Sequence, residues 1–164
     1  MSQTTTRKIE QLLTEYGLSH QNPINKKIHW ICVPAIFFSI VGLIYSIPTR
    51  PIDFLVPYMG PFANWATLAL ILVLFYYYTL SPPLALGMFL FASFCMFLSN
   101  LITIVSPVPL WSICLVIFVL SWLFQLYGHK IEGKKPSFLK DIQFLLIGPA
   151  WLMHFIYKRF GFAY

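Results

Sequence analysis

Charged residues are scarce in this sequence. Only 10% of the 164 residues are Asp, Glu, Lys or Arg, and none of these occurs between Phe54 and His129. A soluble globular domain carries about a quarter charged residues, and so long an uncharged run would leave large exposed apolar patches on a soluble fold. Since 59% of the residues are hydrophobic, the sequence predicts an integral membrane protein.

Several familiar motifs are absent as well. The sequence has no HxxxH or HxxHH box of the di-iron desaturases, no HExxH of zinc proteases and no glycine-rich phosphate loop. Cys32, Cys95 and Cys114 lie in apolar runs without CxxC spacing, which indicates packing residues. The net charge of +6 comes without a nucleic-acid-binding motif. No acidic residue lies within the predicted spans, which argues against an ion or proton pathway.

The apolar runs predict an all-α bundle of four transmembrane helices in one membrane domain, residues 1–164. Crossing a bilayer takes about 20 apolar residues, and four runs bounded by proline, serine or glycine qualify, at residues 28–47, 62–80, 84–105 and 110–127. Residues 7–17 predict an amphipathic helix on the membrane surface or over one end of the bundle. The run 142–157 is shorter and interrupted by Gly148–Pro149, which predicts a broken segment, docked or re-entrant, rather than a fifth span.

The distribution of Lys and Arg predicts the orientation. Nearly all of them fall on the side shared by the two chain ends, and Arg50 is the exception. The positive-inside rule therefore predicts both termini in the cytoplasm, in a bacterial inner membrane or, in a eukaryote, the endoplasmic reticulum. Residues 76–78, three tyrosines, are typical of an interfacial aromatic belt. We expect contacts with membrane lipids, none with nucleic acid, and leave a homo-oligomer open.

This topology brings all four histidines to the same side. Asn22–Pro23 is typical of a helix start, which places His20 just before the first helix and His29 about two turns into it. His129 ends the fourth span and His154 lies in the broken segment. A lone interfacial histidine is more often a polar anchor, but four on one side predict a metal site suited to iron or zinc.

Two polar neighbours of His129 are candidates for supporting this site. Gln125 precedes it by four residues, so that its amide would orient the imidazole, or else bond between helices. Glu132 follows by three residues, as a carboxylate partner or ligand, or as a solvated charge among lysines.

Two segments resemble the signatures of the membrane family of 2-hydroxy fatty acid dioxygenases, which includes a yeast enzyme of fatty acid alpha-oxidation and bacterial relatives. The first signature, H-x-x-P-x-N-x-x-x-H followed by a proline, corresponds to YGLSHQNPINKKIHWICVP, residues 16–34. The second, a Gln, then Gly-His and a nearby Glu and Pro, corresponds to residues 125–136. The matching positions are His20, Pro23, Asn25, His29, Pro34, Gln125, Gly128, His129, Glu132 and Pro136.

The resemblance implies an Fe(II)-dependent dioxygenase that cleaves long-chain 2-hydroxy fatty acids between C1 and C2, with molecular oxygen as co-substrate. The products would be carbon dioxide and a fatty acid one carbon shorter. We expect His20, His29, His129 and His154 to hold the iron and to form the catalytic group. Asn25, Gln125 and Glu132 would support them. Lys134 and Lys135 would steer the substrate carboxylate inward, or else be ordinary flanking charges on the cytoplasmic side.

Two other classes remain open at this point. A non-enzymatic membrane protein that binds lipid or scaffolds a partner would use its histidines as interfacial anchors. A zinc-dependent membrane hydrolase would use the same ligands, because imidazole binds zinc as well as iron.

Overall fold

The computed structural model describes residues 7–133 and 138–163, with side chains described for 7–133 and 144–163. This part of the chain is helical and contains no strand. In chain order the elements are α1 Lys8–Leu18, α2 Pro23–Tyr45, η1 Arg50–Leu55, α3 Val56–Met59, η2 Gly60–Phe62, α4 Trp65–Leu80, α5 Pro82–Val105, α6 Leu110–Glu132 and α7 Phe138–Phe160.

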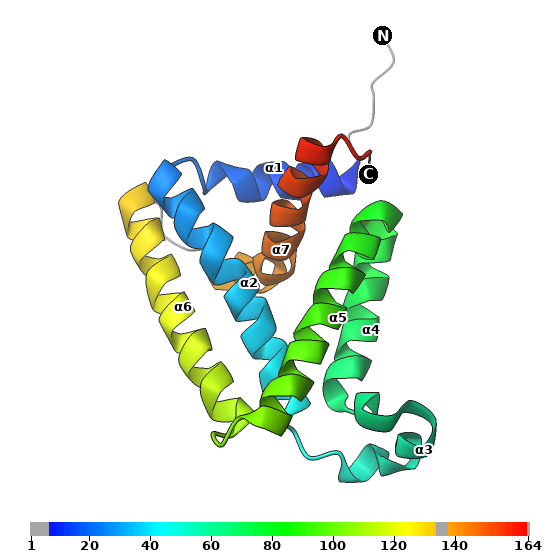
Figure 1. Ribbon diagram of the computed structural model, residues 1–164. Coiled ribbons are helices and arrows are strands. Elements are labelled where there is room, and N and C mark those ends of the chain that lie inside the picture. The colour runs from blue at the N-terminus through cyan, green and yellow to red at the C-terminus, as the bar shows by residue number, and fades with distance from the viewer. Residues whose placement is uncertain (1–6, 134–137, 164) are drawn as a thin grey trace.

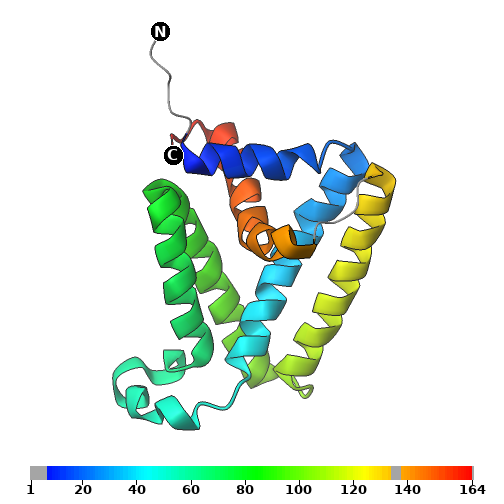
Figure 2. The same cartoon turned by 180° about the vertical axis from the view of Figure 1, so that it is seen from behind.

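The long helices form two neighbouring pairs, α2 with α6 and α4 with α5. Figures 1 and 2 show these pairs meeting at one end and spreading apart toward the other, where α1 lies across the spread ends and α7 fills the space between them. The beginning of α1 and the end of α7 lie at this wider end. Helices α1 and α7 are the first and the last along the sequence. The wider end of the bundle is therefore closed by two segments that are far apart in the chain.

Local capping residues explain where the helices begin. The Asn22 side chain accepts hydrogen bonds from the backbone amides of Ile24 and Asn25, and Pro23 takes the first helical position, so α2 begins where the sequence predicted. Ser81 ends α4 and caps α5. A single residue therefore joins these two helices, as a tight antiparallel hairpin requires.

Three helices among the described residues are long and apolar enough to cross a membrane, namely α2, α5 and α6. The predicted span 62–80 differs from the structure, because α4 has 16 residues and begins only at Trp65. It reaches spanning length only together with Arg50–Phe62, across a bend of 76°. Gly60, with its positive φ of 54°, and the Asn64 cap produce this break. The complete arrangement of four spans stays a prediction.

The last apolar segment corrects a second expectation. Instead of a broken segment over 142–157, α7 is one helix, Phe138–Phe160, that continues through Pro149. Its first turns run at an angle to its last turns, as proline inside a helix favours. It is not among the helices that qualify as spans in the described part of the chain. It packs instead against α1, α2 and α5.

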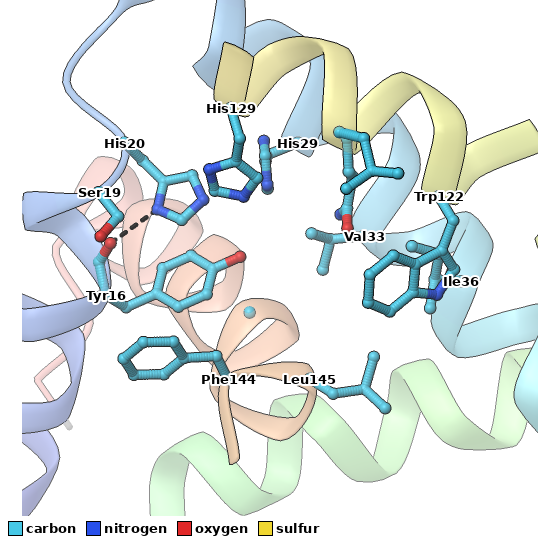
Figure 3. A pocket seen from close by; sticks show the side chains of 13 residues that line it. Tyr16, Ser19, His20, His29, Val33, Ile36, Trp122, His129, Phe144 and Leu145 are labelled. Atoms are coloured by element: carbon cyan, nitrogen blue, oxygen red, sulfur yellow. Dashed lines mark hydrogen bonds between the residues drawn. The ribbon is translucent and has the colours of Figure 1, made fainter. Parts of the chain in front are cut away.

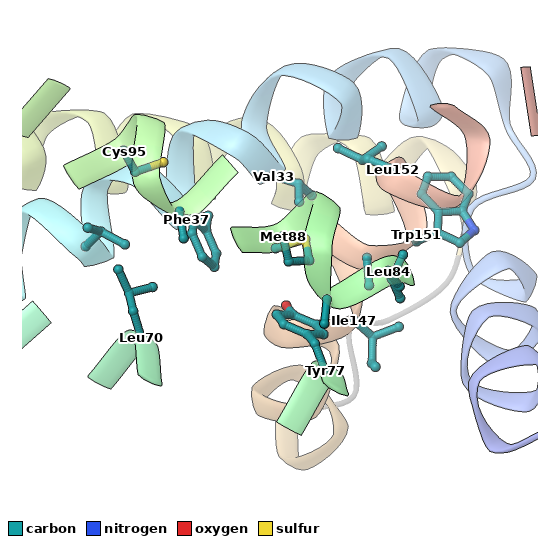
Figure 4. Packing of buried hydrophobic residues seen from close by; sticks show 14 of the residues in the cluster. Val33, Phe37, Leu70, Tyr77, Leu84, Met88, Cys95, Ile147, Trp151 and Leu152 are labelled. Atoms are coloured by element: carbon teal, nitrogen blue, oxygen red, sulfur yellow. The ribbon is translucent and has the colours of Figure 1, made fainter. Parts of the chain in front are cut away.

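The apolar core lies around α7 (Figure 4). Its buried side chains Ile147 and Trp151 contact apolar residues of the surrounding helices, the most buried of which are Ile9, Tyr77, Leu84 and Met88. Tyr77 is fully buried and its hydroxyl donates a hydrogen bond to the carbonyl of Leu146. The expected aromatic belt is therefore wrong for Tyr77, because its ring packs inside the protein, where a hydroxyl needs a partner.

Candidate metal centre

His20 belongs to the short connection between α1 and α2. Its ring stacks on Tyr16, with centroids 4.2 Å apart and planes 13° apart. Its Nδ1–H donates a hydrogen bond to the carbonyl oxygen of Tyr16 at 2.7 Å. The other ring nitrogen, Nε2, therefore carries a lone pair in the neutral ring. That Nε2 atom is buried and has no hydrogen-bond partner within the described part of the chain. A buried, unsatisfied acceptor of this kind is the atom that a metal ion would bind.

His29 repeats the same arrangement one element later. It lies in the second turn of α2, it is only 1% exposed, and its Nδ1–H donates to the carbonyl of Asn25 at 3.0 Å. The backbone thus fixes its orientation and again leaves Nε2 for a metal. Its ring centroid lies 4.2 Å from that of His20, so the connection does turn back far enough for the two to meet.

His129 lies in the last turn of α6. Its ring centroid lies 5.2 Å from His20 and 5.0 Å from His29. Gly128 allows this approach, because a Cβ at that position would overlap the Oδ1 atom of Asn25 on α2. The close contact of α2 and α6 at this level therefore depends on the missing side chain of Gly128.

Together the three rings fit a metal ion. Each offers one nitrogen atom, and these nitrogens all lie within 4.8 Å of one another. A metal that bonds imidazole at about 2.1 Å holds its nitrogens roughly 3 to 4 Å apart, so small ring rotations bring them to bonding distance. Burial lowers the pKa of His20 to about 4, an effect that the hydrogen bond to Tyr16 opposes. His20 is therefore neutral at pH 7, the form that binds metal.

Glu132 holds the connection that carries His20. Its carboxylate accepts hydrogen bonds from the backbone amides of Gln21 and Asn22, both at 2.8 Å, and from the Asn25 side chain at 3.2 Å. It is not one of the metal-ligand group. The carboxylate instead lies at the N-terminus of α2, where a negative charge is favourable. Glu132 is therefore a hydrogen-bond partner of the connection between α1 and α2. The expectation that it is only a solvated charge is wrong.

Asn25 connects this carboxylate to the histidines. Its side chain is fully buried, and besides Glu132 its amide donates to the carbonyl of Ser19 at 3.3 Å. Its own carbonyl is the acceptor for His29. Asn25 therefore joins the loop before His20, the end of α6 and the ring of His29. Its support of a metal site stays a prediction.

The three histidines line one end of a pocket of about 100 Å³ between α1, α2, α6 and α7. Figure 3 shows their rings side by side, with Trp122 and Ile36 toward the other end. Gln125 lines the same pocket, and its role in orienting His129 stays a prediction. The remaining lining is mainly apolar and includes Val33, Leu126, Phe144 and Leu145. Lys134 lies outside the described residues.

His154 is the expected ligand that the structure does not bring to the site. It lines a different pocket on α7, together with Glu10, Leu13, Thr14 and Lys158. These α1 residues precede His20 by more than a helical turn, and Trp151 occupies the position on α7 that contacts the His20 ring. His154 is therefore left out of the metal group, and three histidines remain.

The sequence reasoning missed the aromatic walls of the site. Tyr16 stacks on His20, and Trp151 contacts both rings, with centroids 5.3 Å and 5.6 Å away. The sequence places Tyr16 in the predicted amphipathic helix, residues 7–17, and assigns it no role at the site. Its position four residues before His20, one helical turn, was a signal that the two rings would meet.

Fold and site define a class of protein: the described residues are helical, three helices are long and apolar enough to cross a membrane, and three histidines, two of them buried, meet at one end. The model of one family, described as 2-hydroxy-palmitic acid dioxygenase Mpo1-like, matches residues 6–160, and the chain belongs to this Mpo1-like family. It is 29% identical over 152 residues to the 2-hydroxy-palmitic acid dioxygenase MPO1 of Saccharomyces cerevisiae. The aligned region covers 90% of this chain and 78% of the yeast protein. No solved structure matches the chain.

Proposed function

We propose that this protein is an Fe(II)-dependent dioxygenase that cleaves long-chain 2-hydroxy fatty acids between C1 and C2. One 2-hydroxy acid and one O₂ give carbon dioxide, water and the fatty acid one carbon shorter, so the equation balances without a further reductant. The observation that carries the proposal is the group of His20, His29 and His129, whose nitrogens converge in a pocket that is otherwise lined mainly by apolar residues. The 2-hydroxy-palmitic acid named in the yeast relative's activity supports the choice of substrate.

The protein's own groups hold and shield such a site. Backbone carbonyls of Tyr16 and Asn25 orient two of the three imidazoles so that Nε2 faces the ligand position. Iron bound there would supply the activation of oxygen that side chains cannot perform alone. Both His20 and His29 are at most 3% exposed, so bulk water is kept from the reacting atoms.

The pocket also suits the chemical nature of the substrate. Next to the histidines, Val33, Ile36, Trp122 and Leu145 offer apolar surface for the first carbons of an acyl chain. Polar groups at one end and apolar walls at the other match a molecule with a polar head and a hydrocarbon tail. Interfacial anchor histidines, as a scaffolding protein would have, would be exposed at a surface instead.

The test is oxygen-dependent turnover of 2-hydroxypalmitate by purified, iron-loaded protein in lipid nanodiscs, with formation of the C15 fatty acid measured by mass spectrometry. We expect turnover that stops under anaerobic conditions and on removal of iron by a chelator. Zinc-supported, oxygen-independent hydrolysis would contradict the proposal in favour of the hydrolase. Absence of both activities in iron-loaded protein would favour the scaffold.

A further inference from the structure

A second, larger groove lies beside the histidine pocket, on the outside of α2 and α7. Its volume is about 650 Å³, within the range of about 300 to 1,000 Å³ that is usual for small-molecule sites. The histidine pocket, at about 100 Å³, holds the head of an amphiphile but not a long acyl chain. The groove is lined by Lys26, Trp30, Trp151, Phe155, Ile156, Arg159 and Phe160.

The groove combines two cations with an apolar floor. Lys26 and Arg159 are the only charged residues of its lining, and neither has an acidic partner within the described residues. Trp30, Phe155 and Phe160 are 42%, 37% and 68% exposed, which leaves their aromatic surface available. A pair of cations over such a surface is complementary to an amphiphile with an anionic head, and an arginine matches the two oxygens of a carboxylate.

The groove and the metal site lie on two different faces of helix α2. Asn25 and His29 point to the histidine group, while Lys26 and Trp30, each one residue later, line the groove. Trp151 is common to both places: it lines the groove, its ring contacts His20 at a centroid distance of 5.6 Å, and it is 4% exposed. The wall between the two sites is thus the thickness of one aromatic side chain.

We propose that this groove is the docking site that captures the fatty acid substrate from the membrane. The carboxylate binds between Lys26 and Arg159, the acyl chain lies along Trp30, Phe155 and Ile156, and the molecule reaches the histidines past Trp151. The inference rests on the proposed function for the identity of the amphiphile. The two cations and the aromatic floor are independent of any metal.

The experiment measures binding apart from turnover. Full-length protein carrying His129→Ala, which lacks a metal ligand, is placed in phosphatidylcholine nanodiscs and labelled with a photoreactive diazirine analogue of 2-hydroxypalmitate. Mass spectrometry gives the labelled residues and the concentration for half-maximal labelling. We expect labels on the groove residues, and an increase of that concentration by about tenfold in Lys26→Gln and in Arg159→Gln. Arg159→Lys, which retains the charge but not the paired donors of the guanidinium, should restore part of the binding.

The chain provides matched controls, because each groove cation has a lysine beside it that does not line the groove. Lys27→Gln and Lys158→Gln change the same net charge on the same helices and should alter labelling by less than about twofold. An equal loss in all four variants, or none in any, would overturn the proposal. Equally effective competition by phosphatidylserine would also overturn it, because the groove would then be an anionic phospholipid site.

Steady-state turnover of the iron-loaded parent separates this proposal from the proposed function. We expect Lys26→Gln to raise KM at nearly unchanged kcat, while Lys27→Gln leaves both unchanged. If the parent turns over and the two variants have equal KM, the groove proposal fails and the function stands. If labelling follows the charges but the parent shows no turnover, the groove stands as a fatty acid site and the dioxygenase assignment fails.

Discussion

Helices α2 and α6 pack against each other at both ends, but with different chemistry. At the histidine end, Gly128 of α6 faces Asn25 of α2, and a hydrogen-bonded network through Glu132 surrounds the contact. At the other end, Gly42 of α2 faces Cys114 of α6, both buried among apolar side chains and small hydroxyls. Close packing of the two helices is therefore not sufficient for a candidate metal site. The two contacts differ in the polar groups around them, which include an amide and a carboxylate beside Gly128 and only small hydroxyls and a thiol beside Gly42.

The largest effect is expected from the histidines themselves. His29→Ala or His129→Ala removes one of three ligands and should abolish metal binding and turnover, a loss of at least about 100-fold, as is usual for a group that acts as a unit. His154→Ala is the matched control, because this histidine lies in a separate pocket. Metal content and turnover in the same preparations measure the effect. A metal-free His154→Ala protein would contradict the three-histidine assignment.

The two glycine contacts provide a direct comparison of the two ends. Gly128→Ala and Gly42→Ala should each destabilise the protein by about 1 to 3 kcal/mol, because each added methyl group meets a neighbouring side chain. Only Gly128→Ala should also weaken metal binding, since it displaces Asn25 beside His29. Thermal unfolding and metal titration of both variants provide the measurement. Equal metal affinities would show that the Asn25 contact does not position the histidines.

Glu132→Gln tests the network around the polar contact. The uncharged amide keeps the size of the side chain but weakens the bonds to the amides of Gln21 and Asn22, so the connection that carries His20 loosens. We expect metal affinity to fall by about tenfold, the lower end of the effect of residues that orient metal ligands. Glu10→Gln, on the exposed face of α1 at 41% side-chain exposure, is the control and should leave affinity unchanged. An unchanged affinity in Glu132→Gln would limit Glu132 to a stabilising role.

The smallest effect is expected at the apolar end. The hydroxyl of Ser99 is buried near Gly42 and has no hydrogen-bond partner within the described residues. Ser99→Ala removes an unsatisfied group, so stability should stay within about 1 kcal/mol of the parent or rise slightly. Thermal unfolding in the same nanodiscs tests this. A clear destabilisation would show that Ser99 bonds to a group outside the described residues.

Much of this architecture could be predicted from local sequence. Asn22–Pro23 marked the start of α2, and the long apolar runs marked α5 and α6, because capping and hydrophobicity are properties of neighbouring residues. The kinked, continuous α7 was not predictable in the same way. Proline weakens a helix locally, but packing against three other helices outweighs that loss.

The site shows the same limit. Charge distribution predicted that the histidines share one side, and three of them do meet. Sidedness alone does not decide which helix face each one occupies, so His154 was included although Trp151 fills the position beside His20. The role of Glu132 was hidden because its partners are backbone amides of Gln21 and Asn22, about 110 residues earlier in the chain.

The metal content of anaerobically purified, iron-supplemented protein tests the central claim most directly. Mass spectrometry of the parent should give about one iron per chain, as expected for a single site of three imidazoles. The same preparation with His20, His29 and His129 replaced by alanine should contain none, whereas His154→Ala should retain it. Protein that contains no metal, or zinc alone, under these conditions would contradict the account.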